Sequence, residues 1–195
     1  MDSKINKQIA KSSYKKEKER KETIGTYKYD PTTSTKNVSV YVDTKNKNVK
    51  TSYRGTNINN PKDLLADFHI LTGTESKSNR FKNTLKQTDI IIDKYKDYKL
   101  SNYSHSLGGS QGIYIAKKRN IDKTVAYNAG YSPLSIGRDI KQAIMPTKKQ
   151  ARGIKTTTLK NVYGDPVSIT SNLLSNSKIK NKLPRKFNIH SLSNF

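Results

Sequence analysis

The order in which strand-like and helix-like segments follow one another limits the folds open to this chain more than any other feature. Alternating apolar and polar residues at 37–43 and 49–56 flank the turn-forming run KNKN and predict an antiparallel hairpin. From Val49 onward, predicted strands and helices alternate along the chain. This alternation is typical of an α/β protein with a mostly parallel sheet, helices on both faces, and the hairpin adding antiparallel strands at one edge.

The individual segments are read from hydrophobic periodicity and from turn residues. Apolar residues at helical spacing predict a helix from Arg80 to Tyr95, and KLSNYS reads as the short strand that follows it. The later expected elements, in chain order, are a helix-compatible segment at 106–120, a strand at 124–130, a short helix at 132–145, a strand at 156–166, a helical turn near Asn172 and a basic C-terminal stretch, SKIKNKLPRK.

The length of 195 residues fits one domain. Residues 1–22 are polar and rich in lysine, and we expect them to form a basic, flexible N-terminal arm, with the folded domain at 23–195. We find no apolar run long enough to span a bilayer and no signal-peptide core at the N-terminus. We therefore expect an intracellular protein, either cytoplasmic or associated with a virion.

The charge is strongly basic, with 38 Lys and Arg residues against 15 Asp and Glu and a net charge of +23. Such a surface attracts anionic membranes and, without sequence specificity, nucleic acid. A general bias toward lysine and asparagine explains the same numbers without any dedicated partner. Cysteine is absent, which excludes disulfide scaffolds, thiol catalysis and zinc sites built from cysteine.

Ligand sites in open α/β sheets lie beyond the carboxyl ends of the strands, and a run of small residues follows one such strand. In the segment Tyr103–Gly109, Ser106 stands between a predicted strand and a predicted helix. A nucleophilic serine needs this sharp turn and small neighbours, usually in the pattern G-x-S-x-G, in which Ser104 here takes the place of the first glycine. Ser106 is therefore the candidate nucleophile, and an ordinary glycine-rich turn is the alternative.

A serine nucleophile also needs two donors for the oxyanion of the tetrahedral intermediate. The backbone N–H of Leu107 directly follows the candidate nucleophile and is suited to one of these positions. Thr56 ends the run YRGT after the second hairpin strand and can offer both a backbone N–H and a hydroxyl. A turn with a surface arginine is the simpler interpretation of this run.

The carboxylate and the base of a triad have candidates later in the chain. Asp165 lies in a Gly-Asp-Pro turn after a predicted strand, and His190 lies near the C-terminus, which completes the order Ser, Asp, His. An ordinary Asp-Pro turn and a surface histidine are the alternatives. His69 is the rival base, and Asp122 and Asp139 are rival carboxylates, whereas we expect His105 to pack beneath the turn.

Taken together, YRGT, SHSLGGSQG, NAGYSP, NVYGDPV and the late histidine resemble the class 3 (fungal triacylglycerol) lipase family of α/β-hydrolases. The resemblance covers about residues 38–190. It implies an α/β-hydrolase fold with Ser106 as nucleophile, His190 as general base and acid, Asp165 as its orienting carboxylate, and the N–H groups of Thr56 and Leu107 as the oxyanion hole.

The resemblance also implies a reaction and a substrate class. A carboxylic ester of a lipid, either an acylglycerol or a phospholipid, would be cleaved through an acyl-enzyme, without a metal or an organic cofactor. Residues 57–79 stand where such lipases carry a lid, and they form either a lid or a static helix. The alternative to an enzyme is a catalytically inactive α/β-hydrolase-like basic module that binds nucleic acid or an anionic membrane.

Overall fold

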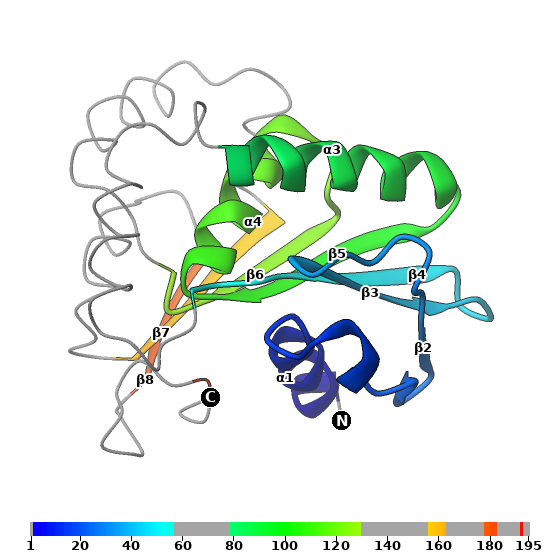
Figure 1. The fold of residues 1–195 in the computed structure, drawn as a ribbon. Helices are drawn as coiled ribbons and strands as arrows, with labels where there is room; N and C mark the ends of the chain where they lie inside the picture. Colours follow the sequence, from blue (N-terminus) through cyan, green and yellow to red (C-terminus); the bar gives the residue numbers. More distant parts are fainter. Residues whose placement is uncertain (1, 57–78, 130–155, 163–177, 183–191, 193–195) are drawn as a thin grey trace.

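The computed structural model describes residues 2–56, 79–129, 156–162, 178–182 and 192, drawn in colour in Figure 1. The helices and strands among these residues are, in chain order, α1 (Asp2–Ser12), η1 (Glu17–Glu19), β1 (Thr23–Ile24), β2 (Tyr27–Tyr29), β3 (Val38–Asp43), β4 (Asn48–Tyr53), α3 (Asn79–Lys94), β5 (Lys99–His105), α4 (Leu107–Lys118), β6 (Lys123–Tyr127), β7 (Thr157–Val162) and β8 (Lys178–Lys182). Within the described ranges, the strands form one eight-stranded sheet in sequence order, so the protein has an α/β fold.

The sheet is antiparallel at its N-terminal edge and parallel in the remainder. Strands β1 to β4 pair antiparallel, and β3 and β4 form the predicted hairpin, in which Val38 faces Tyr53 and Val42 faces Val49. Strands β4 to β8 pair in parallel. Parallel pairing brings the carboxyl ends of β4, β5, β6 and β7 to the same edge of the sheet, where the sequence places its candidate residues.

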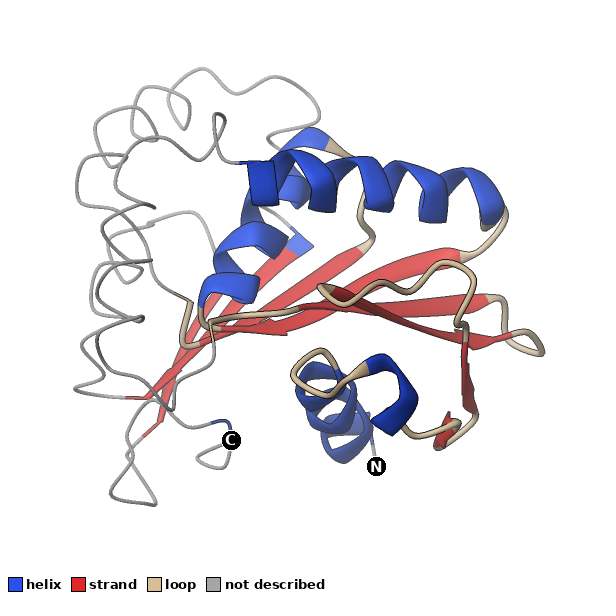
Figure 2. Ribbon diagram, in the orientation of Figure 1, coloured by secondary structure: helices blue, strands red, loops and turns tan. Residues whose placement is uncertain are grey.

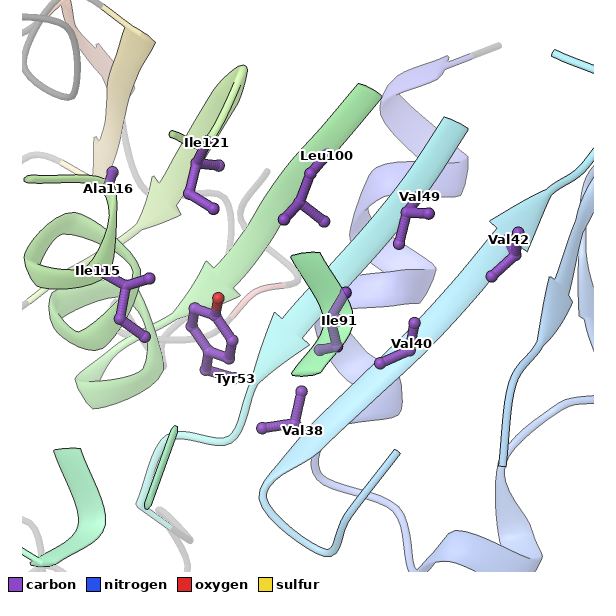
Figure 3. Close-up of a cluster of buried hydrophobic side chains, with 10 residues drawn as sticks. All are labelled: Val38, Val40, Val42, Val49, Tyr53, Ile91, Leu100, Ile115, Ala116 and Ile121. Carbon is purple, nitrogen blue, oxygen red and sulfur yellow. The ribbon is translucent and has the colours of Figure 1, made fainter. Parts of the chain in front are cut away.

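Helices cover both faces of the sheet: α3 and α4 lie on one face, and α1, which is not part of the predicted alternation, lies on the other (Figures 1 and 2). Successive side chains of a strand point to opposite faces. Val38, Val40 and Val42 of β3 accordingly pack with Ile91 of α3 in the cluster of Figure 3. On the other face, Tyr41 packs with residues of α1 and the neighbouring strands.

The N-terminal segment differs from the expected flexible arm. Asp2–Ser12 forms α1, which packs across β4 and β5, and its residues Ile9 and Ala10 are fully buried. Polar groups add to this contact, because Ser12 Oγ lies 2.6 Å from Ser39 Oγ, and Lys50 Nζ donates to Asn6 Oδ1 over 2.7 Å. Residues 2–12 are therefore a helix seated on the sheet, although their composition is that of a solvated segment.

The sheet is also wider than the sequence predicts. The sequence predicts no strand in the basic stretch near the C-terminus, but residues 178–182 form strand β8, which pairs with β7 through Leu159 and Ile179. Two short strands, β1 and β2, extend the opposite edge. Three expected elements, the lid or helix at 57–79, the helix at 132–145 and the turn near Asn172, lie outside the described residues, apart from Asn79, which begins α3.

Candidate active site

Ser106 occupies a strained turn between β5 and α4. Its backbone has φ 56° and ψ −132°, a conformation that side-chain-bearing residues rarely adopt and that costs about 1–3 kcal/mol. Two hydrogen bonds hold it there: the Ser106 N–H donates to Tyr127 O over 2.9 Å, and the Ser110 N–H donates to Ser106 O over 3.1 Å. Strand β6 and the first turn of α4 thus fix the strained residue on both sides.

A glycine allows α4 to begin directly against the end of β4. A Cβ added at Gly108 would lie 2.0 Å from the carbonyl oxygen of Tyr53 and 3.1 Å from the carbonyl carbon of Arg54. No side chain fits in that space, so the helix can approach this closely only with glycine at position 108. The N-terminus of α4, with its free N–H groups and partial positive charge, therefore lies against the loop that follows β4.

Ser104, which replaces the first glycine of the usual pattern, is fully buried and hydrogen-bonded. Its Oγ donates to Asn102 Oδ1 over 2.9 Å and accepts the Tyr53 N–H over 2.8 Å. The hydroxyl therefore ties the last residue of β4 to β5, immediately beside the turn at Ser106. A serine at this position forms an additional link between two strands where the usual motif has no side chain.

The loop after β4 carries Thr56 and lies against the Ser106 turn. A Cβ added at Gly55 would lie 2.8 Å from the carbonyl oxygen of His105, so the two backbones are in close contact. Arg80, at the start of α3, donates through Nη2 to Arg54 O over 2.5 Å and to Gly55 O over 3.2 Å. The structure thus brings the segments that contain Thr56, Ser106 and Leu107 together at the carboxyl edge of β4 and β5.

His105 packs beneath the turn, as the sequence predicts. It is 1% exposed, and its Nδ1 lies 3.0 Å from the hydroxyl of Tyr14, which also donates to His105 O over 3.3 Å. The Tyr14 hydroxyl also packs tightly against Gly55, where an added Cβ would lie 2.2 Å from the Tyr14 oxygen. Burial is the strongest influence on the Tyr14 phenol and raises its pKa, although the nearby charges of Arg80 and Arg54 lower it in part. Tyr14 therefore stays protonated and acts as a neutral hydrogen-bonding group.

Two predicted members of the triad, Asp165 and His190, lie outside the described residues, as do their rivals Asp139 and His69. The rival Asp122 is described. Its carboxylate accepts the N–H of Leu100 over 2.9 Å, at the start of β5, whereas Ser106 follows the end of that strand. A strand of this length spans about 20 Å, so Asp122 is too far away to orient a base for Ser106.

Sequence reasoning missed two polar side chains that contact the loop at 54–56. Tyr14 follows α1 in a segment that reads as solvated, and Arg80 stands at the edge of a predicted helix where a charged residue is ordinary. Arg80 bonds to the loop across 26 and 25 residues, and Tyr14 bonds to His105, beside the loop, across 91 residues. Neither residue belongs to a periodic pattern or a motif that would have identified it.

The described part of the chain shows no metal-binding cluster and no membrane span. Among residues 2–56, 79–129 and the shorter described segments, no three His, Cys, Asp or Glu side chains gather so that they could hold a metal ion. Likewise, none of the helices seen in those segments has the length and apolarity to cross a membrane.

Comparison with known proteins yields similarity in fold but not in sequence. No protein-family model and no curated protein sequence matches the chain. Among solved structures, a triacylglycerol lipase from Penicillium expansum aligns with 99% of this chain and 84% of its own, with a TM-score of 0.52 and 17% identity. The Rhizomucor miehei lipase propeptide complex aligns with 82% of this chain and 60% of its own, with a TM-score of 0.45 and 12% identity. The first of these two matches, with a TM-score above 0.5, shows that the fold is lipase-like.

Proposed function

We propose that the protein is a serine hydrolase that cleaves carboxylic esters through an acyl-enzyme, with Ser106 as its nucleophile. The observation that carries the proposal is the strained backbone of Ser106, with φ 56° and ψ −132°, at the turn from β5 into α4. Strain of this kind persists only where the surroundings impose it, and it collects at functional sites. In this turn it holds the serine above the end of the sheet, at the N-terminus of a helix.

The proposed chemistry is that of a Ser-His-Asp triad, with the residues that the sequence predicts. Ser106 Oγ attacks the ester carbonyl and forms a C–O bond, while its proton passes to His190, which Asp165 orients. The backbone N–H groups of Leu107 and Thr56 stabilise the oxyanion. The bond to the alcohol breaks, and the alcohol leaves with the proton from His190. Water then attacks the acyl-enzyme in the reverse sequence and releases the acid.

The proposed substrates are lipid esters, either acylglycerols or phospholipids, in keeping with the lipase-like fold. Ser106 is 1% exposed in this structure, so an ester reaches its hydroxyl only when the atoms that cover it move aside. The charge of +23 would hold the enzyme at an anionic membrane surface, where such substrates are concentrated.

Labelling with a fluorophosphonate probe tests the nucleophile. Trypsin releases Ser106 in the peptide 100–117, which also contains Ser101, Ser104 and Ser110, so fragment masses must locate the adduct. We expect the adduct on Ser106, its loss in Ser106→Ala, and its retention in the control Ser101→Ala, which changes a serine of the same peptide near the start of β5.

Two further variants test the base. We expect His190→Ala to abolish labelling and His69→Ala to retain it, and the opposite result would assign the base to His69. A folded wild-type protein that neither takes the probe nor hydrolyses esters contradicts the proposal. Salt-sensitive binding of DNA or anionic vesicles by such an inert protein would favour the basic binding module instead.

A further inference from the structure

Two side chains hold the loop at 54–56 although neither takes part in the proposed chemistry. Tyr14 follows α1, on one face of the sheet, and Arg80 lies in the first turn of α3, on the other (Figure 1). We infer that Tyr14 and Arg80 are positioning residues that clamp the peptide groups of this loop and thereby aim the Thr56 N–H at the ester oxygen. The inference rests on the proposed function and adds to it the residues that would keep the oxyanion hole in place.

Arg80 sets the direction of two consecutive peptide groups. Its Nη2 carries two hydrogens and donates to both Arg54 O and Gly55 O, at 2.5 Å and 3.2 Å. In a trans peptide group the C=O and the following N–H point in opposite directions. An arginine that holds the Gly55 carbonyl therefore fixes the direction of the Thr56 N–H, which belongs to the same peptide group.

Tyr14 holds the first of these peptide groups from the opposite side. The Tyr14 hydroxyl packs against Gly55, while the Arg54 carbonyl of the same peptide group accepts from Arg80. The contact is tight, because a Cβ added at Gly55 would lie 2.2 Å from the Tyr14 oxygen. With the Arg54 carbonyl bound by Arg80 and Gly55 packed against the Tyr14 hydroxyl, the group cannot rotate without breaking a hydrogen bond or colliding with the tyrosine.

The same tyrosine oxygen connects the loop to the nucleophile turn. It lies 3.0 Å from Nδ1 and 3.3 Å from the carbonyl oxygen of His105, the residue before Ser106. Both contacts are satisfied when His105 Nδ1–H donates to the tyrosine oxygen and the tyrosine O–H donates to His105 O. One hydroxyl then sets the spacing between the predicted oxyanion donor and the serine that it serves.

Tyr14→Phe tests the first half of the clamp by removing only the hydroxyl. Loss of an oxyanion donor costs about 100- to 1,000-fold in kcat, so a donor that is merely misaligned should cost about 10- to 100-fold. We expect kcat on a soluble short-chain ester to fall by that factor with KM unchanged. Tyr41→Phe is the matched control, because it removes a buried hydroxyl that donates to Lys21 O on the α1 face, over 3.0 Å, without contact to the loop. We expect Tyr41→Phe to retain full activity.

Arg80→Lys tests the second half with its charge retained. A lysine ammonium on a flexible stem lacks the rigid fork of arginine, so it should not hold both carbonyls in one geometry. We expect the same fall in kcat as in Tyr14→Phe. In the double variant, kcat should fall by less than the product of the two single fold-changes, since both residues act on the same peptide groups. Arg119→Lys, which alters the ion pair with Asp89 between α3 and α4, is the matched control and should leave activity intact.

A trifluoromethyl ketone inhibitor distinguishes positioning from a general loss of stability. Its carbonyl carbon bonds to the serine oxygen, and the resulting oxyanion occupies the same hole as in the reaction. We expect its Ki to rise in Tyr14→Phe and Arg80→Lys by the factor by which kcat/KM falls, and to stay unchanged in both controls. An equal fall in activity in variant and control, or a Ki that does not follow kcat/KM, would overturn the inference.

The outcomes separate this inference from the proposed function. If wild-type protein is inert toward both probe and ester, the proposed function fails. If wild-type protein is active and both Tyr14→Phe and Arg80→Lys retain its kcat, the clamp is wrong while the hydrolase stands. Should Tyr14→Phe fail to fold, Arg80→Lys alone decides, because Arg80 is only partly buried at the start of α3.

Discussion

Replacing Gly108 by alanine adds one methyl group where α4 approaches β4, and it should disrupt this contact more than a methyl group added at any other glycine of the helix. The added Cβ would lie 2.0 Å from Tyr53 O and 2.8 Å from Tyr53 C. Both are backbone atoms and cannot rotate away, so the helix and the strand end must separate by about 1 Å to reach a tolerable contact. That displacement moves the Leu107 N–H and Ser106 relative to the loop at 54–56.

The expected magnitudes follow from that separation. Overpacking against rigid atoms costs about 1–3 kcal/mol, and the better helix propensity of alanine offsets at most about 1 kcal/mol of it. For a chain of this length, a net loss of 2 kcal/mol lowers Tm by about 4–8 °C. Because a 1 Å misplacement at a reacting centre costs about 100-fold, we expect kcat/KM to fall by about that factor.

Gly109→Ala is the matched control in the adjacent position. Its Cβ would meet the methyl groups of Ala129 and Ala126 at 3.0 Å and 3.3 Å and the Ser104 carbonyl oxygen at 3.4 Å, so a much smaller shift of the neighbours than at Gly108 relieves the contact. We expect Gly109→Ala to change the free energy of unfolding by less than about 1 kcal/mol and to retain activity. Urea unfolding and ester hydrolysis, measured on both variants, check the comparison. Equal stability and equal kcat/KM in the two variants would refute the reasoning about close approach.

Two further predictions concern pH and salt. Burial alone would raise the pKa of Asp30, but hydrogen bonds from Thr33, Tyr95, Thr32 and Lys94 lower it well below its ordinary 3.8. A carboxyl whose pKa is lowered by folding stabilises the fold above pH 3.8, and this stabilisation is lost as the pH falls further. We therefore expect Asp30→Asn to be less stable than wild type at neutral pH, with a difference that shrinks in acid. A difference in the free energy of unfolding that stays constant between pH 2 and 7 would count against this prediction. Each lysine near an anionic membrane contributes on the order of 1 kcal/mol to binding, and salt screens this attraction. Binding to anionic vesicles should therefore weaken steeply between 50 and 300 mM salt, while turnover of a soluble ester should barely change. Sedimentation with vesicles that does not depend on salt would contradict the membrane proposal.

Local patterns in the sequence were sufficient for the central strands and helices. The alternation of valines in β3 and the helical spacing of apolar residues in α3 require nothing beyond neighbouring residues, and both elements form within a residue or two of the predicted bounds. The turn at Ser106 was likewise predictable, because small residues between a strand and a helix indicate it directly. Asp165 and His190 lie outside the described residues and stay predictions.

The errors occurred where contacts are polar or backbone-mediated. Helix α1 reads as a solvated arm because half of its buried face consists of Asn6 and Ser12, whose partners on the sheet lie far away in the sequence. Strand β8 reads as a basic stretch because its place in the sheet depends on backbone pairing with β7, to which lysine side chains give no clue. Hydrophobic periodicity detects apolar faces and misses both kinds of contact.

By itself, the sequence determined the order of the central strands and helices and the sharp turn at Ser106, because each depends on residues adjacent along the chain. The requirement for glycine at 108 comes from the approach of the Tyr53 backbone, which is distant in the sequence. Only the tertiary structure decided that Tyr14, which follows α1, and Arg80, at the start of α3, both contact the loop of residues 54–56. A hydrogen bond between a hydroxyl and a residue 91 positions away depends on how whole elements pack, and it leaves no local pattern in the chain.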